Sequence, residues 1–386
     1  MNSEADEKNL DKLVLERADE KKLDKIVLKH CINGIEHLSF LHAPHMSPTE
    51  TIALPFSGEN EIQGNCCRGL FYFNSFDCDV DVEDVKAVIV NLTTKELKLI
   101  PPPISPDTYL SDNGLGYDPV TDDYKIIRIS FGGGTADVYS LKSDSWKVIP
   151  GPGDGEMSSK CGIYLKGRSY WRRFELTPDE TDINEFILSF DFSRETFSRI
   201  PFPPSLNPPV SPLPERPGID LDIKLRIFDC DGFLCAVGFK MIYDYKPRDA
   251  KHFELWVYRG GSWERFFSVI LLDVGVPLGV SDGRFLFLEG SSSCGHRHLM
   301  VYDWIKEELR EHDIYVEPPN RFLVLSYVDN TVVLPDATPL INSAQNVDNS
   351  SKKASVPKRI SCSSSGMALK RCRRREKVLK PGELKN

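Results

Sequence analysis

The side chains that bind metals or act as nucleophiles are scattered through the 386 residues of the chain. None of the ten cysteines belongs to a Cys-x-x-Cys pair, the spacing typical of zinc and redox sites. The densest group, Cys294-Gly-His296-Arg-His298, has no second group of ligands at a usual distance along the chain. We therefore predict neither a metal site nor a cofactor.

Two acidic clusters and one glycine run are the remaining candidates for chemistry. Asp77-Cys-Asp-Val-Asp81 and Asp229-Cys-Asp231 do not extend into the ligand spacing of a calcium loop. Gly132-Gly-Gly134 lacks the downstream Lys-Ser/Thr of a phosphate-binding loop. We interpret all three as turns and predict a protein that is not an enzyme. A hydrolase with paired catalytic carboxylates stays open at this stage, because such a pair is recognised by its geometry.

The carboxy-terminal tail carries the one charged motif with a recognisable function. Lys358 and Arg359 form a first basic cluster, and the second comprises Lys370, Arg371, Arg373, Arg374 and Arg375. Two spaced basic clusters are typical of a nuclear-import signal, and each can make charge-assisted contacts with an acidic groove of an importin-type receptor. Non-specific attraction to nucleic acid and a solubilising role are the alternatives.

Composition excludes several classes of protein. The formal net charge is −9, which excludes a uniformly basic nucleic-acid-binding protein, and no specific nucleic acid is predicted as a partner. No run approaches the ~18 apolar residues of a membrane-spanning helix, so no membrane is predicted either. The charged amino terminus is no signal peptide, which favours a location in the cytoplasm, the nucleus or both.

One hairpin-like unit recurs from about residue 50 onwards. It consists of an apolar strand, a turn with Asp, Asn, Ser or Gly, a large side chain, and a second strand that often ends at proline. The large side chain of the five copies is Leu97, Trp146, Phe197, Trp263 or Leu309. A period of about 50 residues predicts an all-β, kelch-like propeller, with a β-sandwich as the alternative. The three aromatic positions are interpreted as blade packing.

A second hairpin, closed by a glycine turn, lies between the copies of the first. It occurs at 165–171, 228–234 and 280–286. Two hairpins in each period supply the four strands of a propeller blade. The number of blades stays open, because the first and last strands of the domain can share one blade.

The domain organisation follows from these patterns. Residues 1–49 are predicted to form a charged leader with a tandem repeat of 13 residues (4–16 and 17–29). A helix over about 17–32 is predicted from its apolar spacing, with a disordered leader as the alternative. Residues 50–338 form the propeller-like domain. Residues 339–386, rich in Ser, Lys and Arg, are predicted to be disordered because they contain too little apolar surface to offset the ordering entropy.

Four motifs resemble those of a known family, in the order in which that family carries them. They are Val90–Pro101 (VNLTTKELKLIP), Asn113–Lys125 (NGLGYDPVTDDYK), Val138–Trp146 (VYSLKSDSW) and Ser326–Leu334 (SYVDNTVVL). Together they resemble the plant F-box-associated domain, and the S-locus F-box and F-box-kelch proteins are the most similar branch.

The resemblance implies a protein–protein interaction module that recruits a target protein for ubiquitination. In this family an F-box binds a Skp-type adaptor within a cullin-based (SCF-type) ubiquitin ligase. Residues 1–49 show neither the Leu-Pro opening of an F-box nor its tryptophan, so the F-box itself is expected to be missing. The alternative is a stand-alone nuclear scaffold or binding protein that no longer couples to the ligase.

Overall fold

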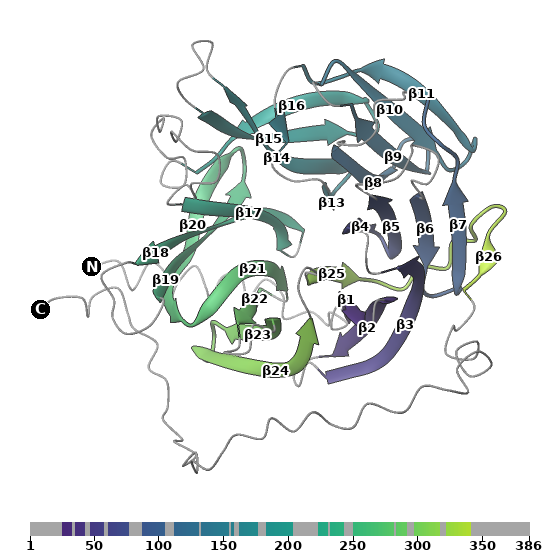
Figure 1. The fold of residues 1–386 in the computed structure, drawn as a ribbon. Helices are drawn as coiled ribbons and strands as arrows, with labels where there is room; N and C mark the ends of the chain where they lie inside the picture. Colours follow the sequence, from purple (N-terminus) through teal and green to yellow (C-terminus); the bar gives the residue numbers. More distant parts are fainter. Residues whose placement is uncertain are drawn as a thin grey trace, which may run out of the picture.

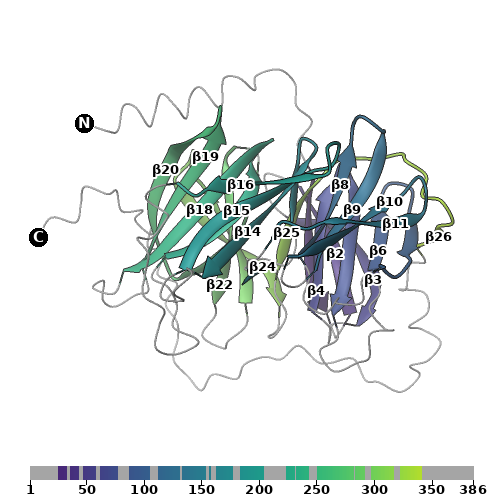
Figure 2. The same cartoon turned by 90° about the horizontal axis from the view of Figure 1, so that it is seen from above.

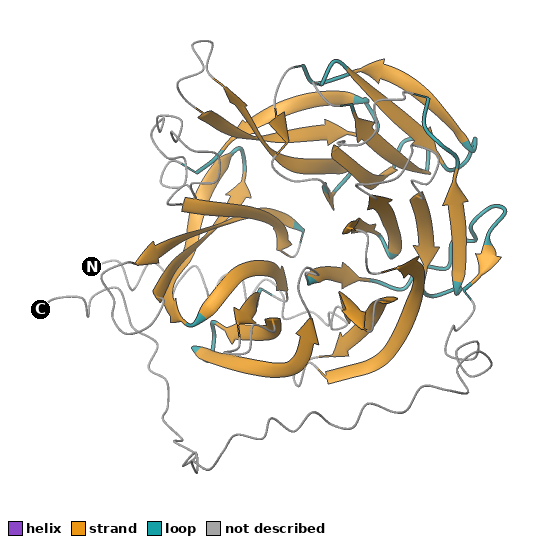
Figure 3. Cartoon of the chain, viewed as in Figure 1, coloured by secondary structure: helices purple, strands orange, loops and turns teal. Residues whose placement is uncertain are grey.

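The computed structural model describes residues 25–340, apart from 33–34, 43–46, 58–60, 77–86, 105–111, 131–132, 154–155, 158–161, 177–182, 204–222, 231, 243–249, 282, 292–296 and 317–321. These residues form strands, turns and loops, and no helix occurs among them (Figure 3). The strands make six antiparallel sheets arranged as blades around a central axis (Figures 1 and 2). The predicted all-β propeller is therefore confirmed, and the β-sandwich alternative is wrong.

Each blade is described from the axis outwards. Blade 1 contains β25 (Leu323–Tyr327), β1 (Lys25–Ile32), β2 (Ile35–His42) and β3 (Ser47–Ser57). Blade 2 contains β4 (Glu61–Cys67), β5 (Leu70–Phe76), β6 (Ala87–Asn91), β7 (Glu96–Ile100) and β26 (Thr338–Pro339). Blade 3 contains β8 (Asp112–Asp118), β9 (Asp123–Ile129), β10 (Thr135–Ser140) and β11 (Ser145–Pro150).

The remaining three blades follow in chain order. Blade 4 contains β12 (Glu156–Met157) and β13 (Ile163–Leu165), which both pair with β14 (Arg168–Leu176), then β15 (Ile183–Asp191) and β16 (Thr196–Pro201). Blade 5 contains β17 (Ile223–Cys230), β18 (Phe233–Ile242), β19 (Ala250–Arg259) and β20 (Ser262–Leu272). Blade 6 contains β21 (Val274–Ser281), β22 (Phe285–Ser291), β23 (Arg297–Asp303) and β24 (Glu308–Val316).

Strands near both ends of the described chain close the ring in blade 1 (Figure 1). β1 pairs with β2 on one side and with β25 on the other, with Lys25 opposite Tyr327. The propeller therefore begins before the predicted boundary at residue 50. At the other end, β26 and Leu340 extend the propeller slightly beyond the predicted boundary at residue 338.

The helix predicted over about 17–32 is wrong for residues 25–32, which form β1. Residues 17–24 lie outside the described residues. Ile26 and Leu28 pack against blade 6, whereas Val27 packs against blade 2. A strand buries alternate side chains on its two faces, so this short apolar run is fully buried between two blades. A helix there would leave β25 without its neighbour in the sheet.

The hydrophobic core is divided among the six interfaces between adjacent blades. Each interface has its own cluster of buried residues, and the clusters together complete the ring. On β5, for example, Phe71 and Phe73 face blade 1, whereas Leu70 and Tyr72 face blade 3. Because both faces of a blade are covered, its inner strands are apolar at consecutive positions instead of alternating with polar residues.

A recurrent turn closes four of the hairpins. Its first residue is Asn91, Asp118, Asp191 or Asp303, and the side-chain oxygen accepts hydrogen bonds from the backbone N–H groups two and three positions later. Its last residue is Lys95, Asp122, Glu195 or Glu307, with φ between 51° and 57°. Such local bonding is why Asn and Asp start turns. The turn chemistry read from the sequence is confirmed.

The large side chain of the repeat occupies the same place in each outer hairpin. Trp146, Phe197 and Trp263 each lie opposite an aromatic residue on the neighbouring strand, with ring centres 4.8–5.2 Å apart. The indole N–H of Trp146 donates to the carbonyl of Pro101, and that of Trp263 to the carbonyl of Pro201, both at 2.8 Å. Each bond joins the outer strand of one blade to the end of the previous blade, which confirms the packing interpretation.

Trp146→Ala is expected to lower the free energy of unfolding by about 3 kcal/mol, because it removes ring packing and the bond to Pro101. Trp146→Phe keeps a ring at the interface and loses only the hydrogen bond, so a loss of about 1 kcal/mol is expected. Chemical denaturation measures both values. An unchanged free energy for the alanine variant would contradict the packing role.

Residues 328–340, which we call the strap, connect β25 at the axis with the rim of blade 2 (Figure 1). Near its start, the Asn330 side chain donates to the carbonyl of Arg68 and to the hydroxyl of Tyr124, at 2.5 and 2.8 Å. The Asn91 side chain donates to the carbonyls of Asn330 and Val332. The strap ends as β26, which pairs with β7. Two of the four family-like motifs, those around Asn91 and Asn330, thus meet in one structural element.

Candidate functional site

One end of the ring collects the tight turns, and we call it the turn face. In an antiparallel blade, the turn between the first and second strands lies at the same end as the turn between the third and fourth. The innermost strands β4, β13 and β17 reach this face close to the axis (Figure 1). The residues of their turns therefore surround the axis on the turn face.

Arg68 lies in the turn between β4 and β5. Arg68 and Gly69 have φ values of 47° and 85°, a conformation that hairpins usually fill with Asn-Gly or Gly-Gly. The Cζ atom of Arg68 lies 4.0 Å from the centre of the Tyr117 ring on blade 3, a cation–π distance. The Arg68 side chain is exposed, so its charge faces solvent while the ring holds its position.

Lys166 takes the equivalent position in the turn between β13 and β14. Lys166 and Gly167 have φ values of 46° and 82°. The Nζ atom of Lys166 lies 4.8 Å from the centre of the Phe233 ring, and the Cζ atom of Arg259 lies 4.5 Å from the same centre. The Nε atom of Arg259 is buried and donates no hydrogen bond. Two cations from different blades thus share one aromatic ring.

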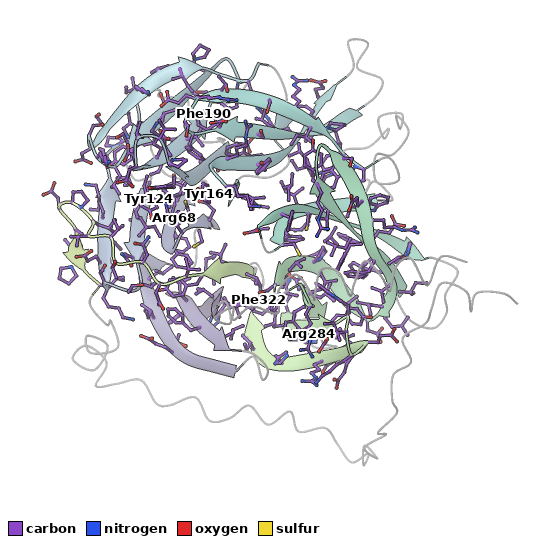
Figure 4. All side chains as sticks on the ribbon, turned by 180° about the vertical axis from the view of Figure 1, so that it is seen from behind. Arg68, Tyr124, Tyr164, Phe190, Arg284 and Phe322 are labelled. Atoms are coloured by element: carbon purple, nitrogen blue, oxygen red, sulfur yellow. The ribbon has the colours of Figure 1, made fainter. Side chains whose placement is uncertain are left out.

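Tyr164 connects the Arg68–Tyr117 pair with the turn that carries Lys166. Its hydroxyl accepts a hydrogen bond from the backbone N–H of Gly167 at 3.1 Å and donates to the carbonyl of Tyr117 at 3.4 Å. Burial raises the pKa of Tyr164, so the hydroxyl stays protonated at neutral pH. Figure 4 shows Arg68, Tyr124 and Tyr164 gathered near the inner edge of the ring. We refer to Arg68, Lys166 and Arg259 as the central cationic cluster.

Among the described residues the central cationic cluster forms no ion pair, although Asp122, which accepts a hydrogen bond from the Tyr117 hydroxyl, lies near the charge of Arg68. No described carboxylate forms an ion pair with Arg68, Lys166 or Arg259, whereas Arg168 and Arg284 on the same face pair with Asp191 and Asp303. Positive charge on an exposed surface attracts anionic groups. The arrangement can therefore bind an anion.

Two cysteines lie beside the cluster, at the end of β4. Burial raises the pKa of Cys66 to about 12 and raises that of Cys67 well above its usual range. A thiol is nucleophilic only as the thiolate, and burial keeps both cysteines in the thiol form at neutral pH.

The residues singled out in the sequence lie elsewhere. Asp229 accepts a hydrogen bond from the backbone N–H of Gly232 at 2.8 Å, so its role in a turn is confirmed. His298 is buried in β23. The predicted nuclear-import residues, the acidic cluster at 77–81, and both Cys294 and His296 lie outside the described residues.

The described residues contain neither a metal-binding cluster nor a membrane-spanning helix. They contain no group of three His, Cys, Asp or Glu side chains arranged to hold a metal ion. No helix long and apolar enough to cross a membrane occurs among them. The structure thus adds no candidate of either kind to those considered from the sequence.

Sequence reasoning did not find the central cationic cluster. The turn Lys166-Gly167 lies inside one of the predicted glycine hairpins, and Arg68-Gly69 has the same form. A large cation directly before the glycine of a two-residue turn was the available signal, because that position favours Asn, Asp or Gly. Arg259 left no such signal, since it ends an ordinary strand.

Fold and site together define a six-bladed β-propeller with a cluster of cationic side chains on its turn face. The family comparison agrees with this class. Residues 59–289, more than half of the chain, match the family described as the F-box associated beta propeller domain. The chain belongs to this family, whose propellers are typically non-catalytic interaction modules.

Relatives from Arabidopsis thaliana match shorter segments. The chain is 36% identical over 124 residues to the F-box/LRR-repeat/kelch-repeat protein At2g27520, covering 31% of this chain and 33% of the relative. It is 30% identical over 187 residues to the F-box/WD-40 repeat-containing protein 1, covering 43% of this chain and 40% of the relative. The matched segments thus span less than half the length of these relatives.

Solved structures show only a distant likeness. A chain of the nidogen/laminin complex superposes with a TM-score of 0.44 at 14% identity, covering 79% of this chain and 99% of that chain. The likeness is too weak to carry a functional inference.

Proposed function

We propose that this protein is a non-catalytic substrate-recognition module of an SCF-type ubiquitin ligase, which holds a target protein for ubiquitination. Membership of the F-box-associated propeller family is the observation that carries the proposal, and matched relatives are named as F-box proteins. A Skp-type adaptor and a cullin are the partners that such membership suggests. A propeller suits this task because it presents many turns on a rigid ring.

The course of the chain supports this arrangement. β1 begins beside Tyr327 at the end of β25, and the strap brings Leu340 next to Lys95. Both places lie on the turn face, because the Val328 carbonyl lies beside Gly69 of the β4–β5 turn and Lys95 belongs to the β6–β7 turn. Segments that precede residue 25 or follow residue 340 therefore join the propeller on the face that carries the central cationic cluster. A target bound at the cluster lies on the same side as any connection to the ligase.

Affinity purification tests the proposal. The tagged full chain is expressed in plant cells with the proteasome inhibited, and the co-purifying proteins are identified by mass spectrometry. We expect a Skp-type adaptor, a cullin and ubiquitinated target proteins. Targets recovered without adaptor and cullin would contradict the ligase function and favour the alternative, a stand-alone nuclear scaffold or binding protein.

The tail motif gives a separate prediction about localisation. A fluorescent reporter fused to residues 350–386 is expected to concentrate in nuclei, because the two basic clusters suit an importin-type receptor. The matched control replaces Arg373, Arg374 and Arg375 with Ala and is expected to spread through cytoplasm and nucleus. Equal distribution of the two fusions would rule out an import signal in this segment.

A further inference from the structure

We propose that the place of β1 in the ring can be filled by either of two segments of this chain, the observed strand at 25–32 or the first copy of the tandem repeat. The inference does not rest on the proposed function. Three features support it: the likeness of the two copies, the burial of the positions that they would share, and the extent of the ladder between β1 and β25.

The first feature is that β1 begins inside the second copy of the repeat. The two copies, residues 4–16 and 17–29, differ only at their first, sixth, tenth and thirteenth positions. The last five residues of the second copy, KIVLK, form the first part of β1. The corresponding residues of the first copy, 12–16, read KLVLE, and we call them the duplicate. The chain therefore carries a close copy of the strand that closes its own ring.

The second feature is the burial of the shared positions. Ile26, Val27 and Leu28 are at most 1% exposed and pack between blades 6 and 2. The duplicate offers Leu, Val and Leu in the same order, at residues 13–15. Replacing Ile by Leu conserves the volume of the side chain, and such substitutions are the ones that a core tolerates best. The duplicate therefore suits the space between the two blades.

The third feature is the extent of the ladder with β25. This ladder begins with Lys25 opposite Tyr327 and ends at Lys29, so it involves only the part of β1 that the duplicate reproduces. Residues 30–32 pair with β2 alone. The ring is closed by the ladder between β1 and β25. A segment equivalent to these five residues can therefore re-form every pair that closure requires.

Residues beyond the duplicate explain why the observed strand is favoured. Moving the chain by the 13 residues of the repeat would place Glu16 where Lys29 lies and Arg17 where His30 lies. His30 is 6% exposed and shares a hydrogen bond of 2.7 Å with Ser39, which the shift would break. The shift also reverses one buried charge and buries a guanidinium, and both changes are costly. The shifted closure is therefore the less populated one.

The two closures distribute the chain differently around blade 1. The shifted closure extends the connection to β2 from residues 33–34 to residues 20–34. It also shortens the leader by the 13 residues of one repeat, which is up to about 40 Å of extended chain. The exchange thus changes the distance between the propeller and any segment on its amino-terminal side.

The test compares aspartate variants of the full chain by thermal unfolding. Val27→Asp blocks the observed closure, because it places a carboxylate at a fully buried position. We expect this variant to stay folded through the duplicate, with an unfolding midpoint about 5–10 °C below that of the wild type. Leu38→Asp is the matched control. Leu38 is equally buried in the same core cluster but has no duplicate, so this variant should show no cooperative transition.

Val14→Asp isolates the contribution of the duplicate. Alone it should leave the midpoint unchanged, whereas its combination with Val27→Asp should behave like Leu38→Asp, since neither segment can then close the ring. Native-state digestion with trypsin, followed by mass spectrometry, gives an independent measurement. Cleavage after Lys29 should be at least about 10-fold faster in Val27→Asp than in the wild type, because Lys29 leaves the sheet in the shifted closure.

Any of four outcomes would overturn the inference. Val27→Asp could fail to fold as Leu38→Asp does, or the double variant could be as stable as Val27→Asp. Cleavage after Lys29 could be the same in Val27→Asp and the wild type. Val27→Asp could also fold only as a dimer, which would place the duplicate in a neighbouring molecule. None of these outcomes bears on the proposed function, which the purification from plant cells tests separately.

Discussion

Asp118→Asn is expected to lower the free energy of unfolding by about 3–5 kcal/mol at neutral pH, the loss typical of breaking a buried ion pair. The Asp118 side chain is fully buried and accepts hydrogen bonds from Lys125 Nζ at 2.8 Å and from the hydroxyls of Thr121 and Ser193 at 2.6 Å. Lys125 also reaches Glu195 at 3.0 Å. The network joins blade 3 to the β15–β16 turn of blade 4, and Asn leaves Lys125 buried without its closest charge.

The pH dependence of this loss has a definite sign. Burial alone would raise the pKa of Asp118, but hydrogen bonds from Lys125, Ser193 and Thr121 lower it well below its usual range. The folded-state pKa thus lies below the unfolded value of about 3.9. The carboxylate contributes its full stabilisation above the unfolded pKa and loses it as the pH falls through the folded one. The difference between wild type and Asp118→Asn should therefore shrink below about pH 4.

Asp112 provides a matched control at the other end of the same strand, β8. It is also fully buried, but neither of its carboxylate oxygens accepts a hydrogen bond, and its ion pair with Arg173 Nε measures 3.4 Å. Burial raises the pKa of Asp112 to about 7, although Arg173 opposes the shift. Because the folded-state pKa exceeds the unfolded one, stability falls as the pH rises from about 4 to about 7.

Asp112→Asn should therefore cost less than about 1 kcal/mol at pH 7, and its stability relative to wild type should improve as the pH rises from about 4 to about 7 and then level off. Urea denaturation of both Asn variants between pH 3 and pH 8 measures these differences. Equal losses for Asp118→Asn and Asp112→Asn would contradict the assignment of opposite roles to the two carboxylates.

Asn330→Ala is expected to cost about 3 kcal/mol, because it removes one buried and two partly buried hydrogen bonds worth about 1 kcal/mol each. The Asn330 side chain donates to the carbonyl of Arg68 and the hydroxyl of Tyr124, and it accepts from the backbone N–H of Val332 at 2.8 Å. These bonds hold the strap against blade 2. Thr331→Ala, at the exposed next position, should stay within about 0.5 kcal/mol of the wild type.

A double-mutant cycle with Asn91 tests whether the strap acts as one unit. Asn91 donates to the carbonyls of Asn330 and Val332 at 3.0 and 2.7 Å. Once Asn330→Ala has loosened the strap, Asn91→Ala has less left to remove, so the combined loss should fall short of the sum of the single losses. Strict additivity would mean that the two asparagines act independently.

Much of the blade architecture could be predicted because it depends on short-range patterns. The outer hairpins around Trp146, Phe197 and Trp263 and the glycine hairpins at 165–171, 228–234 and 280–286 appear where the repeat placed them. Asn and Asp at the start of a turn bond to backbone groups two and three residues away, so the signal is contained within the turn. Local patterns do not fix the number of blades, because β25 and β1, which lie far apart in the chain, share blade 1.

Ring closure is where local reasoning failed. Ile26, Val27 and Cys31 are spaced as in an amphipathic helix, but residues 25–32 form a strand. The strand is decided by β25, about 300 residues later in the chain, whose edge pairs with β1. A local pattern contains no information about a partner at that distance, because apolar residues at such short spacing suit a helix or a doubly buried strand equally well.

The sequence by itself determined the kind of domain, because the repeat, the turn residues and the family motifs are each contained in a few neighbouring residues. The tertiary structure alone decided the site. Arg68 and Lys166 lie in turns near the axis on blades 2 and 4, Arg259 ends the third strand of blade 5, and only the closed ring brings them to one face. The rings of Tyr117 and Phe233, which hold these charges in place, are supplied by other strands, so the arrangement of the cluster is not visible in any single segment.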